Sequence, residues 1–229
     1  MATPQAKLQI PSPATPLVTI EQYLAQERRA TERHEYLDGR LYRMAGESPE
    51  HADISADLVM LIGTQLGDGP CRVRTKDSKV RSGLMPVPRD STKGLFSYPD
   101  LVVICGEPEY LDAHRDVITN PTLIIEVMSE STALFDLREK FFRYQIYNPT
   151  LLEYLLVRQD MPAVEVFERQ RDGSWRYTPH MDLAQSAKLN SIKCVLPLAR
   201  VYRRVAFALP NEPAKVSPSK KTPRKRAKK

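Results

Sequence analysis

The chain has 229 residues, 41% of them apolar, which is enough to bury one hydrophobic core and predicts a single folded domain. No run approaches the roughly 18 apolar residues that a membrane span needs, and the N-terminus lacks a secretory signal, so we expect a soluble, cytoplasmic protein. The net charge of +6 suggests nucleic-acid binding, but eight of the 34 basic residues follow position 214, where there are no acids. The first 214 residues therefore hold 26 basic and 28 acidic side chains and are nearly neutral.

Cysteine and histidine spacing argues against a disulfide framework and against a zinc site. The cysteines, Cys71, Cys105 and Cys194, are an odd number, lie far apart and form no C-x-x-C pair. The four histidines show no metal-binding motif such as H-E-x-x-H. We therefore expect buried free thiols, and we do not expect a zinc hydrolase.

The two ends of the chain have the composition of disordered segments. Residues 1–17 hold four prolines among small polar residues, and residues 210–229 combine prolines with lysines and arginines. Such segments cannot bury enough apolar surface to offset the entropy lost on ordering, which leaves residues 18–209 as the predicted domain. The basic tail is either a solvated segment or an arm that binds nucleic-acid phosphates. Its candidate contacts are Lys220, Lys221, Arg224, Lys225, Arg226, Lys228 and Lys229.

The first predicted elements are a helix and a hairpin. Thr19 and Gln22 have the spacing of a capping box, which predicts a helix that continues to about residue 33. The Asp-Gly pair at 38–39 tolerates the positive φ angles of a tight turn and predicts a hairpin over residues 35–44.

A second helix and two buried strands follow. Apolar residues recur at helical spacing over residues 49–66. Polar and apolar residues alternate over residues 71–82, which predicts an exposed strand. Residues 83–97 contain several prolines and glycines, which predicts a loop. The short apolar runs at 101–105 and 123–128 predict strands that are covered on both faces.

The second half of the chain predicts one helix, one central strand and one hairpin. The helix covers residues 134–147 and the strand covers residues 153–157. The hairpin joins residues 164–168 to residues 175–177 through a turn at Asp172-Gly173.

Two acids lie in or beside the apolar strands. Glu126 interrupts the run Leu123–Met128, where a lone carboxylate is costly unless it is paired or bound to a metal. Taken alone, Glu126 fits a buried salt bridge as well as a metal site, and Asp100, which opens the preceding strand, fits a solvated acid or a turn cap. Because acids on successive strands can meet at one end of a sheet, the pair favours a hard cation such as Mg²⁺.

A possible third component lies on the helix that follows Glu126. Asp136 and Lys140 are spaced i, i+4, so a helix over this segment would place both on one face. The alternative is an ordinary surface salt bridge, which is common on helices and contributes little to stability.

A series of motifs runs in unbroken order from about residue 19 to residue 205. It comprises Glu35-Tyr36-Leu37-Asp38-Gly39, Tyr98-Pro99-Asp100-Leu101-Val102-Val103, Asn120-Pro121-Thr122-Leu123-Ile124-Ile125-Glu126-Val127-Met128-Ser129-Glu130-Ser131-Thr132, Asp136 through Arg138-Glu139-Lys140 to Tyr144, and Glu153-Tyr154-Leu155-Leu156-Val157. Together these motifs resemble the Uma-two family of restriction endonucleases, within the PD-(D/E)xK nuclease superfamily. Several motifs in series are much harder to obtain by chance than one.

The resemblance implies a restriction-endonuclease-like α/β fold, in which helices flank a central mixed β-sheet, with an N-terminal helix-hairpin and a C-terminal β-hairpin. It also implies that Asp100 and Glu126 bind Mg²⁺, or Mn²⁺ in its place, and that a lysine positions or deprotonates the attacking water. The lysine expected two residues after the glutamate is replaced by Met128. In the resembled family it has moved to the following helix, here Lys140, which requires that helix to pack against the strand ends.

The same resemblance adds Glu35 to the catalytic acids, although a solvated acid before a turn is the alternative. Four further residues are candidates for supporting the catalytic acids by hydrogen bonding, namely His51, Ser129, Asp136 and Tyr144. His51 either contacts the scissile phosphate or caps the helix after Pro49, and we favour the cap. For Tyr144, simple packing is the alternative to hydrogen bonding in the site.

These observations predict a metal-dependent endonuclease that hydrolyses DNA phosphodiester bonds. One alternative is a catalytically silent module of the same fold that binds DNA or a protein, and another is a hydrolase of smaller phosphoesters, which needs the same acids. Cutting both strands of a duplex requires two active sites, so a homodimer is a plausible assembly, although no residue in the sequence demonstrates it.

Overall fold

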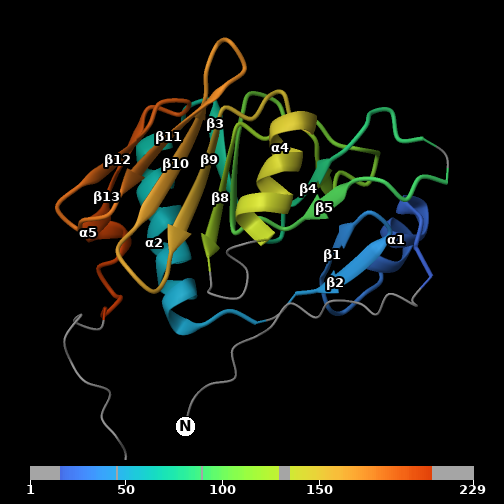
Figure 1. Ribbon diagram of the computed structural model, residues 1–229, viewed down its shortest axis with the longest axis horizontal. Coiled ribbons are helices and arrows are strands. Elements are labelled where there is room, and N and C mark those ends of the chain that lie inside the picture. The colour runs from blue at the N-terminus through green and yellow to red at the C-terminus, as the bar shows by residue number, and fades with distance from the viewer. Residues whose placement is uncertain (1–15, 45, 89, 129–134, 208–229) are drawn as a thin grey trace, which may run out of the picture.

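The computed structural model describes residues 16–44, 46–88, 90–128 and 135–207. A six-stranded mixed sheet forms the centre of the domain. Figure 1 shows its arrangement. Its strands are β3 (Cys71–Thr75), β6 (Leu101–Cys105), β8 (Leu123–Met128), β9 (Glu153–Arg158), β10 (Val164–Arg169) and β11 (Trp175–His180). Their spatial order is β11-β10-β9-β8-β6-β3. β8 and β9 run parallel, whereas the other neighbours run antiparallel.

A second sheet of five short strands carries the N-terminal hairpin. Its strands are β1 (His34–Leu37), β2 (Arg40–Arg43), β4 (Lys79–Ser82), β5 (Leu95–Ser97) and β7 (Val117–Ile118), in the order β2-β1-β5-β4-β7. The helix α1 (Ile20–Glu27) buries Tyr23 against Tyr36 and Phe96 of this sheet. This contact fixes the position of β1, the strand that carries Glu35.

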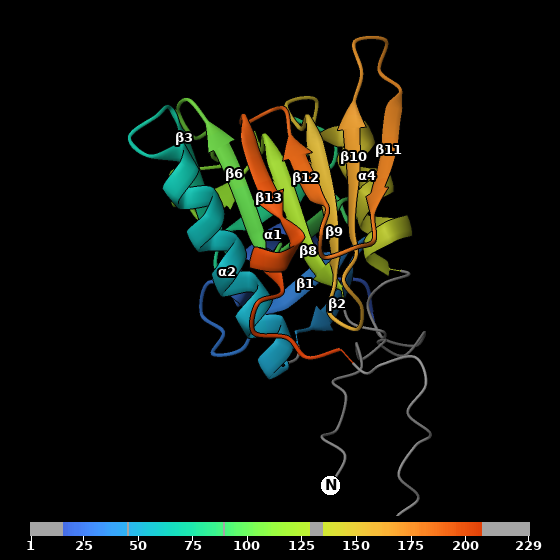
Figure 2. The same ribbon diagram turned by 90° about the vertical axis from the view of Figure 1, so that its left-hand side faces the viewer.

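The two faces of the six-stranded sheet are covered by different elements. One face carries α2 (Pro49–Leu66), the hairpin of β12 (Ser186–Leu189) and β13 (Cys194–Pro197), and the short helix α5 (Leu198–Val201) (Figure 2). The other face carries the π-helical turn η1 (Asp136–Lys140), which continues into α4 (Phe141–Tyr147), together with residues of the second sheet (Figure 1).

Side chains of β8 point alternately to the two faces of the sheet, and each face has its own hydrophobic core. Leu123, Ile125 and Val127 pack in the cluster that includes α2, whereas Ile124 and Met128 pack in the cluster that includes α4. Side chains alternate along a strand, so Glu126 points to the same face as Ile124 and Met128. The one carboxylate of this strand is therefore directed toward η1, α4 and the second sheet.

Much of the predicted secondary structure is confirmed. The capping box of Thr19 and Gln22 begins α1, and α2 covers the predicted residues 49–66. Asp38 and Gly39 have φ angles of 46° and 86°, as the predicted tight turn requires. The two apolar strands are buried on both faces, and the helices flank a mixed sheet as predicted.

Three local predictions were wrong. The first helix ends at Glu27 and not near residue 33, because the Glu27 carboxylate accepts a hydrogen bond from the His34 amide, 2.8 Å away, where β1 begins. Residues 79–82 form a buried strand of the second sheet and not the end of an exposed one. Residues 95–97, predicted as loop, form the buried strand β5.

Two polar residues of β4 made this segment look exposed in the sequence, although each has a side-chain partner inside the protein. Lys79 lies 3.5 Å from Asp116, and the Ser82 hydroxyl bonds the side chain of Asn148. A polar strand can be buried when its groups are satisfied in this way, and the partners lie far away in the sequence. The short elements β7, β12, β13 and α5 had no counterpart in the prediction.

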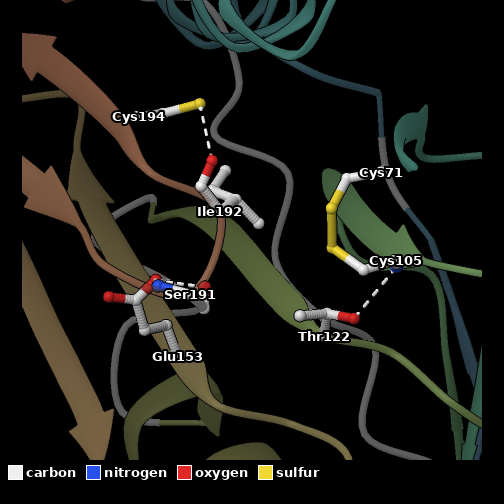
Figure 3. Close-up of a disulfide and its surroundings, with 7 residues drawn as sticks. All are labelled: Cys71, Cys105, Thr122, Glu153, Ser191, Ile192 and Cys194. Atoms are coloured by element: carbon white, nitrogen blue, oxygen red, sulfur yellow. Dashed lines mark hydrogen bonds between the residues drawn. A yellow bond between two sulfur atoms is a disulfide. The ribbon is translucent and has the colours of Figure 1, made fainter. Parts of the chain in front are cut away.

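The prediction of three free thiols was also wrong, because Cys71 and Cys105 form a disulfide (Figure 3). The antiparallel register of β3 and β6 places these two residues directly opposite each other. Their separation of 34 residues conceals this pairing in the sequence. Cys194 is the buried free thiol that was expected.

Two further sequence predictions concern membranes and the chain ends. In the described part of the chain, no helix combines the length and the apolar character that crossing a membrane requires. The predicted leader up to residue 15 and the predicted basic tail lie outside the described residues.

Candidate active site

Four charged side chains from three elements meet in the interior. The Lys140 ammonium on η1 lies 2.9 Å from the Glu35 carboxylate on β1, 3.2 Å from that of Glu126 on β8 and 3.1 Å from that of Asp136 on η1. An ammonium group has three N–H donors, so each can serve one of these acids. The four side chains are only 4–7% exposed, which removes the cluster from bulk water.

Local structure explains why these side chains converge. The π-helical turn brings Asp136 and Lys140 together, and the Tyr154 hydroxyl donates to the Asp136 carbonyl oxygen over 3.0 Å. Glu35 is held from the second sheet, where the Tyr98 amide donates to its Oε1 atom over 3.1 Å. The lysine therefore reaches Glu126 because η1 packs against β8, as the displaced-lysine assignment required.

The cluster holds more acidic than basic side chains. Burial raises the pKa of Glu126 well above its usual range, and Asp136, Asp100 and Glu35 raise it further although Lys140 opposes them. Burial likewise raises the pKa of Glu35. Burial alone would lower the pKa of Lys140, but its three acids together raise that pKa well above its usual range, so the lysine is held as a cation.

Tyr144 on α4 hydrogen-bonds within the cluster. Its hydroxyl lies 3.4 Å from Glu126 Oε1, the same oxygen that Lys140 contacts, and 2.7 Å from the Ser97 hydroxyl on β5. Burial raises its pKa well above the usual range, so it stays protonated and can donate. Tyr144 therefore links Glu126 to the second sheet.

Asp100 lies at the more open side of this cluster. Its Oδ2 atom accepts a hydrogen bond from the Val127 amide over 2.7 Å and lies 3.2 Å from His51 Nε2. His51 Nδ1 lies 3.0 Å from Glu47, which in turn pairs with Lys76. Asp100 and His51 are 14% and 13% exposed, so a ligand can approach from this side more easily than from that of Lys140.

The structure thus brings together most of the residues predicted for the site. Glu35, Glu126, Asp136, Lys140 and Tyr144 form the buried cluster, and Asp100 and His51 lie beside it. The favoured helix-capping role of the His51 side chain was wrong, because the Ser48 hydroxyl caps α2 and accepts from the His51 amide. Ser129 and the tail residues from Lys220 to Lys229 lie outside the described residues.

The position of the expected lysine is filled by an apolar side chain. Met128 is 5% exposed and packs in the core with Phe141 and Leu156. Three contributors to the site were missed in the sequence, namely Glu47, Ser97 and Tyr98. The Tyr98 contact is made by a backbone amide, which no residue type reveals.

A cation is the group that this donor set fits. Asp100 and Glu126 offer carboxylate oxygens, the ligands that Mg²⁺ prefers, and the surrounding acids outnumber the lysine. Across the described ranges, no group of three or more His, Cys, Asp or Glu side chains is arranged so that it could hold a metal ion. That result is compatible with Mg²⁺, which is usually held by one or two carboxylates together with water and substrate phosphate.

The fold and the arrangement of acids around one lysine define a restriction-endonuclease-like protein. The chain belongs to the Uma2 family, whose model carries the description "Putative restriction endonuclease" and matches residues 20–198.

Similar proteins include two from Synechocystis sp., both described as uncharacterized. One, slr1290, is 32% identical over 197 residues, which cover 86% of this chain and 97% of that protein. The other, sll1609, is 34% identical over 167 residues, which cover 73% of this chain and 89% of that protein.

A solved structure shares the fold. It is described as a putative nuclease belonging to DUF820 from Anabaena variabilis, and it superimposes with a TM-score of 0.64 at 13% identity. The match covers 81% of this chain and 98% of that one. It confirms the predicted restriction-endonuclease-like fold.

Proposed function

We propose that the protein is a metal-dependent endonuclease that hydrolyses DNA phosphodiester bonds. The observation that carries this proposal is the buried excess of carboxylates around Glu126, at 2.9–3.2 Å from a single lysine and beside the more accessible Asp100. An excess of buried negative charge is costly unless a cation offsets it. The family description supports the same class of reaction.

Mg²⁺ is the proposed cofactor, and Asp100 and Glu126 would hold it. When bound, it would supply Lewis acidity toward a phosphodiester. Mn²⁺ has the same preference for oxygen ligands and is expected to substitute.

The remaining residues have distinct tasks in this proposal. Lys140 stays protonated because of its three acidic neighbours, so its positive charge stabilises negative charge on the reacting phosphate, and it does not act as a base. Glu35 and Asp136 hold its ammonium in place. Tyr144 donates to Glu126 and restrains its carboxylate. His51 contacts Asp100 and restrains that side chain.

The direct test is cleavage of supercoiled and linear DNA by the purified protein with Mg²⁺ or Mn²⁺. Asp100→Asn, Glu126→Gln and Lys140→Met should each lower the cleavage rate by about 10²-fold or more, as is typical when a preorganised electrostatic group is removed. Glu153→Gln is the matched control, because it also alters a buried glutamate of the sheet and should retain cleavage.

The outcomes separate the nuclease from the alternatives. Wild-type rates in Asp100→Asn and Glu126→Gln would remove these residues from the reaction. Intact DNA binding without cleavage by the wild type would favour a silent binding module. Turnover of a chromogenic phosphodiester without action on DNA would favour a hydrolase of smaller esters.

A further inference from the structure

An arginine pair surrounds Tyr110 in the connection between β6 and β7. The guanidinium carbon of Arg74 lies 5.8 Å from the centre of the Tyr110 ring, and that of Arg115 lies 5.1 Å from it. Arg74 also donates to the Tyr110 hydroxyl over 3.0 Å. Both arginines lower the pKa of this partly buried phenol, Arg74 most strongly through its hydrogen bond to the phenol oxygen.

Neither arginine is paired with an acid in the part of the chain that the structure describes. Within the described ranges, no carboxylate forms an ion pair with Arg74 or Arg115. The nearby acids Asp112 and Asp116 instead pair with Arg28, at 2.6 and 2.8 Å. Two guanidinium groups on one ring repel each other, so an anion that contacts both would stabilise the arrangement.

The pair adjoins the open side of the candidate active site. Arg74 lies on β3, whose neighbour Thr75 is paired with Leu101, the residue after Asp100. Lys76, next along the chain, is linked through Glu47 and His51 to the Asp100 carboxylate. Arg72 is exposed and projects to the same face of β3 as Arg74, since alternate residues of a strand share a face.

We propose that Arg74 and Arg115, held in place by Tyr110, form a clamp for a backbone phosphate of the DNA strand that enters the candidate active site. Planar guanidinium groups match phosphate oxygens in bidentate geometry. The contact would position the strand without reading its sequence. This inference rests on the proposed function, because it takes DNA as the substrate.

The test is the salt dependence of DNA binding, measured without divalent metal by fluorescence anisotropy of a labelled 20-base-pair duplex. Each lost phosphate contact should lower the slope of log affinity against log salt concentration by about 1, so Arg74→Gln/Arg115→Gln should lower it by about 2. Arg171→Gln is the matched control. It removes one exposed positive charge at the β10–β11 turn and should keep the wild-type slope.

Two further measurements keep the result interpretable. Tyr110→Phe retains both charges and should weaken binding severalfold with little change in slope, because Arg74 loses the hydroxyl to which it donates. Melting temperatures near that of the wild type will show that each variant is folded, and the single variant Arg115→Gln, at an exposed position, should lower the slope by about 1 even if the double variant is unstable.

An unchanged slope in the folded double variant would overturn the clamp while leaving cleavage at Glu126 untouched. A reduced slope would support the clamp even if the wild type cleaved no DNA, since binding and cleavage are measured separately. A wild type that fails to bind the duplex at low salt would overturn the clamp.

Discussion

Two buried glutamates on neighbouring strands of one sheet have opposite surroundings. Glu153 on β9 accepts a hydrogen bond from the Asn190 amide over 2.8 Å. It also accepts hydrogen bonds from the Ser191 amide, over 3.2 Å, and from the Ser191 hydroxyl (Figure 3). Glu126 on β8 instead faces Lys140 and several further acids. Burial raises the pKa of both glutamates.

The comparison shows that burial alone does not mark a functional acid. The three donors around Glu153 are uncharged groups that complete its hydrogen bonding, and it joins the β12–β13 connection to the sheet. Around Glu126 the protein gathers further negative charge, which destabilises the cluster unless a cation is present. We therefore assign Glu153 a structural role, and we propose Glu126 as a metal ligand.

The largest effect is expected for Lys140→Met. Removing the cation leaves Glu35, Glu126 and Asp136 without their shared partner, so unfolding free energy should fall by about 3–5 kcal/mol and cleavage should be lost. Urea denaturation measures the first effect and DNA cleavage the second.

The double variant Lys140→Met/Glu126→Gln is the control for charge. It removes one acid together with the lysine, so it should recover part of the stability but none of the cleavage. Equal stability of the single and double variants would contradict a cluster that is dominated by excess negative charge.

The Cys71–Cys105 disulfide tests whether scaffold and site are separable. In the chain-entropy model, closing a loop of 34 residues stabilises the protein by about 3–4 kcal/mol, so Cys71→Ser should lower stability by this amount. Cleavage at a temperature where the variant is folded should be retained. A loss of cleavage in the folded variant would show that β3 controls the geometry of the site.

Glu153→Gln should have a smaller effect, about 1–3 kcal/mol, because the amide can accept only some of the hydrogen bonds that the carboxylate accepts. Urea denaturation of the variant beside the wild type measures the loss. If cleavage by the folded variant fell as far as in Glu126→Gln, the distinction between the two glutamates would fail.

The smallest expected effect is a pH dependence of the difference in stability between the wild type and Glu153→Gln. Burial raises the pKa of Glu153 above its ordinary value of 4.5, although Ser191 and Asn190 oppose the shift. The native state therefore binds its proton more tightly than the unfolded state, so this group contributes fully at low pH and its contribution is lost as pH rises through the native pKa. Because glutamine does not ionise, the stability gap between wild type and Glu153→Gln should narrow as the pH rises from the ordinary glutamate pKa of 4.5 through the raised native pKa, as urea midpoints will show. A gap that widens would contradict the sign of the shift.

The sequence predicts this molecule best where local signals determine structure. The Thr19 capping box and the apolar runs at 101–105 and 123–128 depend on nearby residues, and all three are present. The Cys71–Cys105 disulfide and the buried strand β4 depend on register and on partners distant in the chain, and both were missed.

The candidate site shows the same division. Glu126 is conspicuous because its neighbours are all apolar, and the convergence of Glu35 and Lys140 was inferred only through family resemblance. The contact between His51 and Asp100 depends on how α2 packs beside β6. The local sequence around either residue does not predict that packing.

The most direct test of the account is the melting temperature of the wild type, Glu126→Gln and Glu153→Gln with and without Mg²⁺ or Mn²⁺. A ligand at 100 times its Kd stabilises the native state by about 2.7 kcal/mol, so the wild type and Glu153→Gln should melt on the order of 5 °C higher with metal. Glu126→Gln should show no such shift. A shift that survives in Glu126→Gln, or that is absent in the wild type, would contradict the claim that Glu126 is a metal ligand.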